Sequence, residues 1–326
     1  MKMMKTTFKW YLFLVIALVM LLTPQFITNV YYQHIINLVG IYTLITIGLN
    51  ILSGYTGQVS MGHAGYYAIG TYVSSLLMLN LHMPFWLSVL IAVVAVAICG
   101  LVVGIPAMKL SGPYLVLATV GFGEIVRLVI LNWTPVTKGA AGLTGIPLPR
   151  LFGLQITGEK DFFYLIFFVV LIGCYIAQRI ARSKIGRTYM AIREDELAAE
   201  AMGVPVNTYK ISAFVISAIY AGIAGCLFGA YSGVASPDNF TFDDSVGFLC
   251  MSVVGGNNTI IGALIGSFVL TILSELLRVF QSLRLILYGL ILIMTVIYMP
   301  KGLAGFIEPV RKWMAIHMKK STLIQD

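Results

Sequence analysis

No lysine, arginine, aspartate or glutamate occurs between residues 10 and 108 of this chain. A soluble domain cannot be built from such a segment, because its surface needs charged side chains. A helix needs about 20 apolar residues to cross the hydrocarbon core of a bilayer. The uncharged segment therefore has room for about four crossings, and the chain is expected to be an integral membrane protein.

The rest of the composition agrees with this expectation. The whole chain is 59% hydrophobic and 10% charged, whereas a soluble domain carries about 25% charged residues. This excludes a disordered tail, a secreted disulfide scaffold and a cytosolic enzyme. The four cysteines stand singly in apolar runs without metal-ligand spacing, so we expect no metal and no cofactor.

The apolar runs predict an all-α bundle in a single membrane domain that covers residues 1–326. The first run resembles the apolar core of a signal peptide, but no small-residue cleavage site follows it, so we expect it to remain as a span. The short run at 245–257 is either a span or a re-entrant segment, which leaves nine or ten crossings. The candidate spans are residues 10–29, 35–53, 64–80, 85–105, 114–132, 162–179, 210–232, 245–257, 260–278 and 284–299.

Basic residues indicate how the bundle is oriented. They concentrate in the N-terminal tail, in residues 179–210 and in the C-terminal tail. Loops rich in lysine and arginine stay on the cytoplasmic side. Ten spans place all three segments on that side, so both termini are expected in the cytoplasm. The net charge of +8 is then explained by orientation, and we expect no nucleic-acid partner.

A polar, glycine-rich segment, Ser53–Gly65, separates two apolar runs. Its glycines disfavour a continuous helix. Non-helical backbone at membrane depth is tolerated where protein or a water-filled cavity surrounds it, and broken helices often line transport sites. Gln58, Ser60 and His63 are therefore candidate lining residues of a translocation path. The alternative is a plain cytoplasmic turn.

Ser60 and His63 also have a spacing that suggests nucleophilic catalysis. No nucleophile elbow accompanies them, and no acidic residue lies nearby in the sequence to orient the histidine. A packed or hydrogen-bonded histidine is the favoured interpretation, and we expect no enzymatic activity.

Two pairs of opposite charges stand three residues apart inside predicted spans. Glu124 pairs with Arg127, and Glu275 pairs with Arg278. Residues at this spacing share a helix face and can neutralise one another. Charges at membrane depth usually face a protein interior or a cavity. A structural ion pair and a role along the translocation path both remain open.

The longest polar insert, residues 182–209, is expected to be a cytoplasmic loop that contains a helix. Ser183 can cap the start of this helix, Gly203 can take the left-handed position after its end, and Pro205 prevents continuation. We predict one continuous helix over 186–202. Its alanines suit docking into another protein, and the alternative is a solvated linker. The chain has no phosphate-binding loop of the type that binds ATP, so an ATP-driven process needs another subunit.

Several motifs together resemble the permease subunits of high-affinity branched-chain amino acid ABC importers, over nearly the full chain, and more closely the second of the two related permeases. The longer inner loop is the reason for that assignment. The motifs that carry the resemblance are Gly57–Ala64, Gly112–Leu115, Gly121–Glu124, Gly142–Ile146, Ser183–Arg187, Ala191–Glu194, Ala221–Gly225, Ser236-Pro237 and Gly255-Gly256.

The resemblance implies a type II importer fold with ten helices in a bacterial inner membrane. It also implies a paralogous permease subunit, two cytosolic ATP-binding subunits and an extracytoplasmic substrate-binding protein as partners. The inner helix would be the coupling helix, related to the EAA loop, although its acid, Glu196, stands one residue earlier than in that motif. The residues expected to couple to the ATPases are Arg193, Glu194, Glu196, Ala198, Ala199 and Gly203.

The expected function is ATP-driven import of leucine, isoleucine or valine. A related branch of permeases moves urea or short amides, so a substrate of that class stays open. The sequence is also compatible with a passive channel for a small neutral solute and with an intramembrane hydrolase that uses Ser60 and His63.

Overall fold

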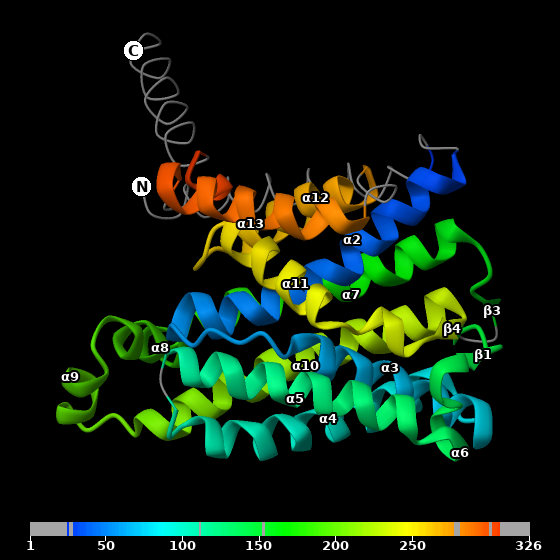
Figure 1. Ribbon diagram of the computed structural model, residues 1–326, viewed down its shortest axis with the longest axis horizontal. Helices are drawn as coiled ribbons and strands as arrows, with labels where there is room; N and C mark the ends of the chain where they lie inside the picture. Colours follow the sequence, from blue (N-terminus) through cyan, green and yellow to red (C-terminus); the bar gives the residue numbers. More distant parts are fainter. Residues whose placement is uncertain are drawn as a thin grey trace, which may run out of the picture.

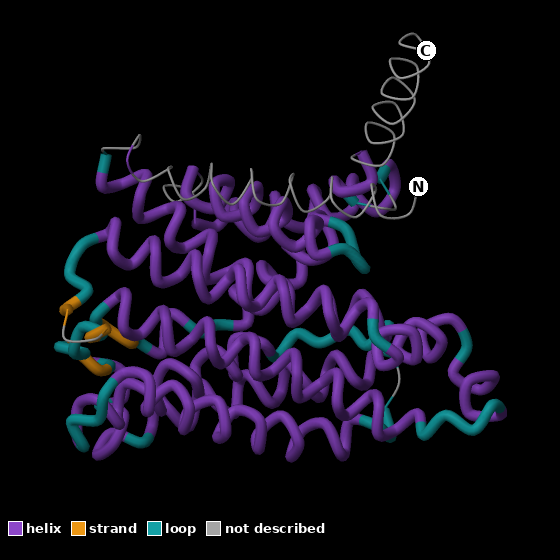
Figure 2. Tube along the Cα trace, turned by 180° about the vertical axis from the view of Figure 1, so that it is seen from behind, coloured by secondary structure: helices purple, strands orange, loops and turns teal. Residues whose placement is uncertain are grey.

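The computed structural model describes residues 29–110, 112–151, 154–276, 281–299 and 302–306, together with Gln25. Within this part of the chain the protein is a bundle of long helices, with two pairs of very short strands at one end (Figure 2). The predicted all-α membrane class is confirmed in this coarse form. Five of the described helices are long and apolar enough to cross a membrane.

The long helices follow the predicted apolar runs closely. Every predicted span from 35–53 onward coincides with a helix, whereas the predicted first span, 10–29, falls almost wholly outside the described residues. The helices are α2 (Val30–Leu49), α3 (His63–Asn80), α4 (Phe85–Ala107), α5 (Pro113–Asn132), α7 (Glu159–Arg182), α10 (Val206–Ser232), α11 (Phe242–Gly255), α12 (Ile260–Leu276) and α13 (Gln281–Tyr298). The helix α2 continues into a π-helix, η1 (Asn50–Tyr55).

Short elements gather at the two ends of the bundle (Figure 1). The helices α8 (Lys184–Glu194) and α9 (Glu196–Ala201) lie at the end that we call the α9 end. The opposite end, which we call the strand end, carries the remaining elements: α6 (Thr134–Thr137), η2 (Gly139–Ala141), β1 (Leu143–Thr144), β2 (Arg150–Leu151), β3 (Leu154–Gln155), β4 (Val234–Ala235) and η3 (Pro237–Asn239). A further short helix is η4 (Leu303–Phe306).

The strand end is held together by backbone pairing between distant segments. The strand β1 pairs antiparallel with β4, with Leu143 opposite Ala235. Gly142 has a φ of +69°, and a side chain there would overlap the carbonyl of Ala235. The long loop after α5 is thereby fastened to the segment that follows α10.

The centre of the bundle is the contact between α3 and α10. A Cβ atom added to Gly70 would overlap the Gly222 carbonyl, and one added to Gly225 would overlap the Tyr67 carbonyl. Small residues let helix backbones approach this closely where lipid provides no hydrophobic driving force. The outer helices are more exposed, and their apolar side chains, such as Leu90 of α4 and Ile125 of α5, are 62% exposed.

The insert of residues 182–209 differs from the prediction in one respect. The hydroxyl of Ser183 accepts a hydrogen bond from the Gly186 N–H, and Gly203 has a φ of +81°, as expected. The predicted continuous helix over 186–202 is wrong, because Asp195 is extended and separates α8 from α9. Its carboxylate accepts from the Ala198 N–H at 3.0 Å. An aspartate caps a helix start well and competes with the backbone inside one.

Candidate functional site

The predicted interruption of the helix between Ser53 and Gly65 is confirmed. The π-helical end of α2 stops at Tyr55, residues 57–62 have no regular secondary structure, and α3 begins at His63. Gly57 has a φ of +74°, which a residue with a side chain rarely adopts. We call residues 57–62 the extended segment.

Neighbouring helices satisfy the backbone of this segment. The Met61 N–H donates to the Thr119 hydroxyl of α5 at 3.0 Å. Just beyond the segment, the Ala64 N–H donates to the Ser245 hydroxyl of α11, also at 3.0 Å. Such partners are what non-helical backbone requires inside a membrane bundle. These two hydrogen bonds therefore fasten the segment and the start of α3 to α5 and α11.

His63 is a buried, hydrogen-bonded histidine, as the sequence predicts. Its Nδ1 lies 3.2 Å from the Ser60 hydroxyl, and its Nε2 lies 2.6 Å from the Ser217 hydroxyl of α10. Ser60 and Ser217 have no exposed surface. A serine nucleophile must reach its substrate, so this geometry does not favour the hydrolase alternative.

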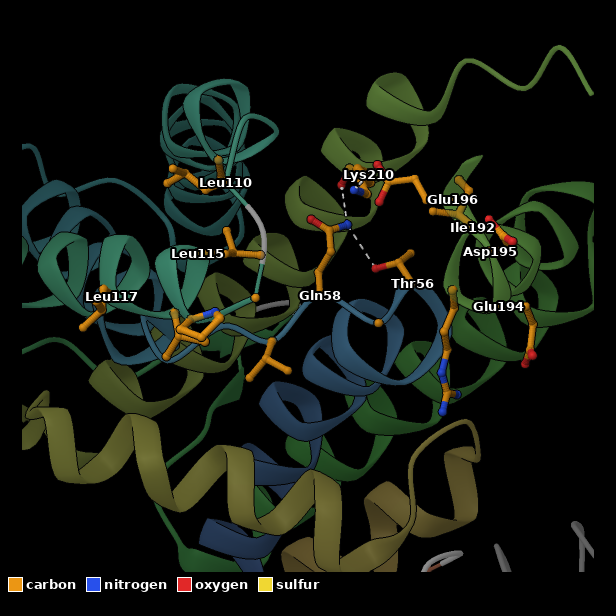
Figure 3. A pocket seen from close by; sticks show the side chains of 17 residues that line it. Thr56, Gln58, Leu110, Leu115, Leu117, Ile192, Glu194, Asp195, Glu196 and Lys210 are labelled. Atoms are coloured by element: carbon orange, nitrogen blue, oxygen red, sulfur yellow. Dashed lines mark hydrogen bonds and ion pairs between the residues drawn. The ribbon is translucent and has the colours of Figure 1, made fainter. Parts of the chain in front are cut away.

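Gln58 faces a cavity of about 690 Å³ at the α9 end (Figure 3). Its Nε2 donates to the Thr56 hydroxyl at 3.1 Å and to the Lys210 carbonyl at 3.5 Å. Three segments line the cavity, namely residues 56–59, the α4–α5 connection and the α8–α9 junction with Lys210. Ser60 and His63 do not line it, so the structure separates them from Gln58.

The two walls of this cavity differ in character. One wall is apolar and includes Leu110, Leu115 and Leu117, whereas the other carries Glu194, Asp195 and Glu196 (Figure 3). The Lys210 Nζ lies 2.5 Å from the Glu196 Oε1 and pairs with it. The cavity is therefore polar toward the insert of residues 182–209 and apolar toward α4 and α5.

The first predicted ion pair is confirmed. The Arg127 Nε lies 2.9 Å from the Glu124 Oε2, and the two side chains are 27% and 37% exposed. They stand on α5, a helix that is mostly exposed within this chain. In the second predicted pair, Arg278 lies outside the described residues, while Glu275 accepts a hydrogen bond from the Tyr31 hydroxyl at 3.0 Å.

The residues predicted to couple to an ATPase differ in how exposed they are. Ala199 is buried in a small cluster with Ile192 and Val206, whereas Arg193, Glu194, Glu196, Ala198 and Gly203 are exposed. Although Arg193 is exposed, its Nη1 donates to the Gly54 carbonyl at 2.6 Å, so its head group reaches the end of η1. The largest exposed apolar side chains here are Leu197 and Met202, at 77% and 84%.

Sequence reasoning missed the asparagine junction beside the extended segment. The Asn50 Oδ1 accepts from the Asn258 N–H at 2.7 Å, and its Nδ2 donates to the Thr259 carbonyl at 2.9 Å. The Tyr55 hydroxyl donates to the Asn258 carbonyl at 3.0 Å. A buried asparagine inside an apolar run is the signal that could have found this junction.

A second missed cluster lies nearer the strand end. The Glu159 Oε2 of α7 accepts from the Asn37 Nδ2 of α2 at 2.8 Å and from the Tyr231 hydroxyl of α10 at 2.5 Å. His34 lies 2.5 Å from that same hydroxyl. Hydrogen bonds to a carboxylate are stronger than those between neutral groups, so the cluster joins three helices at one point.

The chain matches known proteins over most of its length. A family model described as "Branched-chain amino acid transport system / permease component" matches residues 31–296. The chain is 34% identical to the high-affinity branched-chain amino acid transport system permease protein LivM of Escherichia coli K12, over 93% of this chain and 77% of that protein.

Two further relatives are more distant. LivH of Escherichia coli K12, described as a permease protein of the same kind of system, is 26% identical over 81% of this chain and 91% of that protein. The autoinducer 2 import system permease protein LsrC of Enterobacter sp. 638 is 30% identical over 60% of this chain and 56% of that protein. No solved structure matches the chain.

Proposed function

Because the chain belongs to the family of permease components of branched-chain amino acid transport systems, we propose that it forms part of the translocation path of an ABC importer for leucine, isoleucine and valine. The observation that carries this proposal is the 34% identity to LivM over 93% of the chain. The helical bundle, with its interrupted helix at the extended segment, supports it.

The proposed membrane arrangement has ten spans in one domain over residues 1–326. It adds residues 10–29 to the helices described above and places both termini in the cytoplasm of a bacterial inner membrane. The six basic residues of 179–210 support this orientation, since they lie in and around α8 and α9 at one end of the bundle.

The proposed partners are a paralogous permease, two cytosolic ATP-binding subunits and an external substrate-binding protein. The match to LivH, a second permease of the same kind of system, supports pairing between two related permeases. The lack of an ATP-binding loop in the sequence supports a separate motor. Lipid surrounds the outer helices, whose apolar side chains are exposed.

The proposed path runs along α5 and past Gln58. The half-buried Glu124 and Arg127 pair supports a location between this chain and the second permease, because a charged pair at membrane depth requires polar or protein surroundings. Gln58 faces the cavity at the α9 end. Ser60 and His63 contribute by holding the extended segment to α10.

The proposed coupling element is residues 182–209. Glu194, Glu196, Ala198 and Gly203 stand on its exposed surface, together with Leu197 and Met202, while Ala199 packs against Ile192 of α8 and Val206 of α10. ATP-driven closure of the partner subunits would push on this surface. The bundle would then change from outward-open to inward-open, a shift between two packings.

The test is uptake by the reconstituted complex in liposomes, with radiolabelled leucine, isoleucine, valine and urea compared at equal concentration. The proposal predicts ATP-dependent uptake of the three amino acids that requires the binding protein. Uptake of urea alone would reassign the substrate class. Full flux through this chain alone, without ATP, would identify a passive channel and overturn the proposal.

A further inference from the structure

We propose that Arg193 is a positioning residue that acts inward: it fastens the cytoplasmic insert to the end of η1 and passes movement of the insert to the α11–α12 loop. This inference rests on the proposed function, because it names the route by which movement enters the bundle. It assigns Arg193 to the permease itself instead of to the contact with an ATPase.

The first part of the route is the contact between Arg193 and the end of a helix. The Nη1 donates to the Gly54 carbonyl at 2.6 Å, and Gly54 lies in the last turn of η1. The last carbonyls of a helix have no partner within the helix, and they carry partial negative charge that favours a cation. The guanidinium therefore provides a charge-assisted cap that joins α8 to the α2–η1 helix.

Gly57 extends this contact across the break in the helix. A Cβ atom placed on Gly57 would lie 3.2 Å from the Arg193 Cγ. The arginine stem thus rests on backbone at one side of the break while its head group binds backbone at the other. The insert holds both the end of η1 and the start of the extended segment through one side chain.

The second part of the route lies on another side of the same helical turn. The Asn50 side chain accepts from the Asn258 N–H and donates to the Thr259 carbonyl, and the Tyr55 hydroxyl donates to the Asn258 carbonyl. Asn258 has a φ of +72°, so three hydrogen bonds keep the α11–α12 loop in an unusual conformation. η1 is therefore bonded to the insert and to this loop at once.

Gly54 brings the two contacts together. A Cβ atom added there would lie 2.8 Å from the Asn258 backbone nitrogen and closer still to the Asn50 amide. A displacement of Gly54 by Arg193 therefore meets Asn50 and Asn258 without an intervening gap. Packed and hydrogen-bonded chains of this kind can carry coupling between two sites. Double-mutant measurements demonstrate such coupling.

Arg187 provides a matched control on the same helix. Its guanidinium donates only locally, to the Arg182 carbonyl at 3.3 Å. Arg193→Met and Arg187→Met remove the same charge and leave similar stems. A general effect of positive charge on α8 would appear in both variants, whereas the proposed route passes through Arg193 alone.

The functional experiment measures ATP hydrolysis and leucine uptake in the same proteoliposomes. For Arg193→Met we expect uptake per ATP hydrolysed to fall about tenfold, the loss typical of one charge-assisted hydrogen bond, while the complex still assembles and hydrolyses ATP. Arg187→Met should match wild type. Asn50→Ala should reproduce the loss, and the Arg193→Met/Asn50→Ala double variant should be no worse than the more affected single variant.

A second measurement does not depend on transport. In the purified full-length chain, amide hydrogen exchange should rise at residues 54–58 and at Asn258 in Arg193→Met, and not in Arg187→Met. Unchanged exchange at Asn258 would overturn the proposed route. So would unchanged uptake per ATP, or loss of the ATP-binding subunits, which would place Arg193 in their contact. Absence of ATP-driven uptake in wild type would contradict only the proposed function.

Discussion

The Nε2 of His63, the first residue of α3, lies 2.6 Å from the Ser217 hydroxyl of α10, and neither side chain is more than 1% exposed. Removal of this hydroxyl in Ser217→Ala leaves a buried ring nitrogen without its partner. An unsatisfied buried polar group costs about 1–3 kcal/mol. We expect the free energy of unfolding to fall by that amount, measured as a lower melting temperature in detergent.

Ser88→Ala is the control for this variant. Ser88 is also fully buried, but its hydroxyl donates only to the Pro84 carbonyl at the start of its own helix. An equal loss of stability in both variants would show that the bond between α3 and α10 has no special weight.

Gly225 lies at a close contact between α3 and α10. A side chain there meets the Tyr67 carbonyl and the Thr71 backbone, so Gly225→Ala must push the two helices apart. Overpacking of this kind costs about 1–3 kcal/mol. The expected result is a lower melting temperature and a lower yield of folded protein.

Gly289→Ala serves as the comparison, because nothing lies within 4 Å of an added Cβ atom at that position of α13. Alanine favours a helix over glycine by about 1 kcal/mol, so this variant should be as stable as wild type or more so. If Gly225→Ala were equally well tolerated, the close packing described here would be incorrect.

The Glu124 and Arg127 pair should behave as a unit. Glu124→Gln and Arg127→Met each leave one uncompensated charge within α5, and such a charge is costly at membrane depth. We expect each single variant to lower leucine uptake more than the double variant does. A double-mutant cycle on uptake and on membrane expression measures this coupling, and strictly additive losses would argue against it.

The backbone at Gly203 gives a graded prediction. Its φ is +81°, and an added Cβ atom would meet nothing within 4 Å. The cost of a substitution there is therefore backbone strain, about 1–2 kcal/mol for a residue with a side chain and least for asparagine. Gly203→Asn should retain ATP-driven uptake, and Gly203→Val should lose it together with co-purification of the ATP-binding subunits. The same uptake in both variants would remove Gly203 from the coupling element.

Glu159 and Asp161 stand in the first turn of α7 and share its helix dipole. Only Glu159 accepts from Asn37 and Tyr231. Glu159→Gln should thus lower the free energy of unfolding by about 1–3 kcal/mol, seen as a lower melting temperature. Asp161→Asn should leave the melting temperature unchanged. Equal shifts would attribute the effect to the dipole alone.

The sequence predicts the long helices of the bundle well because each is an apolar run, and every residue of such a run contributes to the signal. The break at Gly57 is also predictable, because it needs a positive φ, which glycine adopts readily, and the glycine itself is visible in the sequence. The interruption at Asp195 is not, because a single helix cap of about 1 kcal/mol decides between one helix and two.

The partners of the candidate site residues were beyond sequence reasoning for a different reason. Ser217 is separated from His63 by 154 positions, and Asn258 from Asn50 by 208. Such pairs depend on how whole helices cross, and no local pattern in the chain encodes the crossing. The contact of Arg193 with Gly54, 139 positions away, cannot be read from the local sequence for the same reason.

The pairing of β1 with β4 has a consequence for whatever docks at the strand end. Since Leu143 and Ala235 are already paired, a protein that docked there would contact backbone that is ordered in advance. Its binding would avoid the ordering entropy that commonly weakens binding through unstructured segments. A cut in the loop after α5 would restore that entropy cost, and we would expect it to weaken such binding.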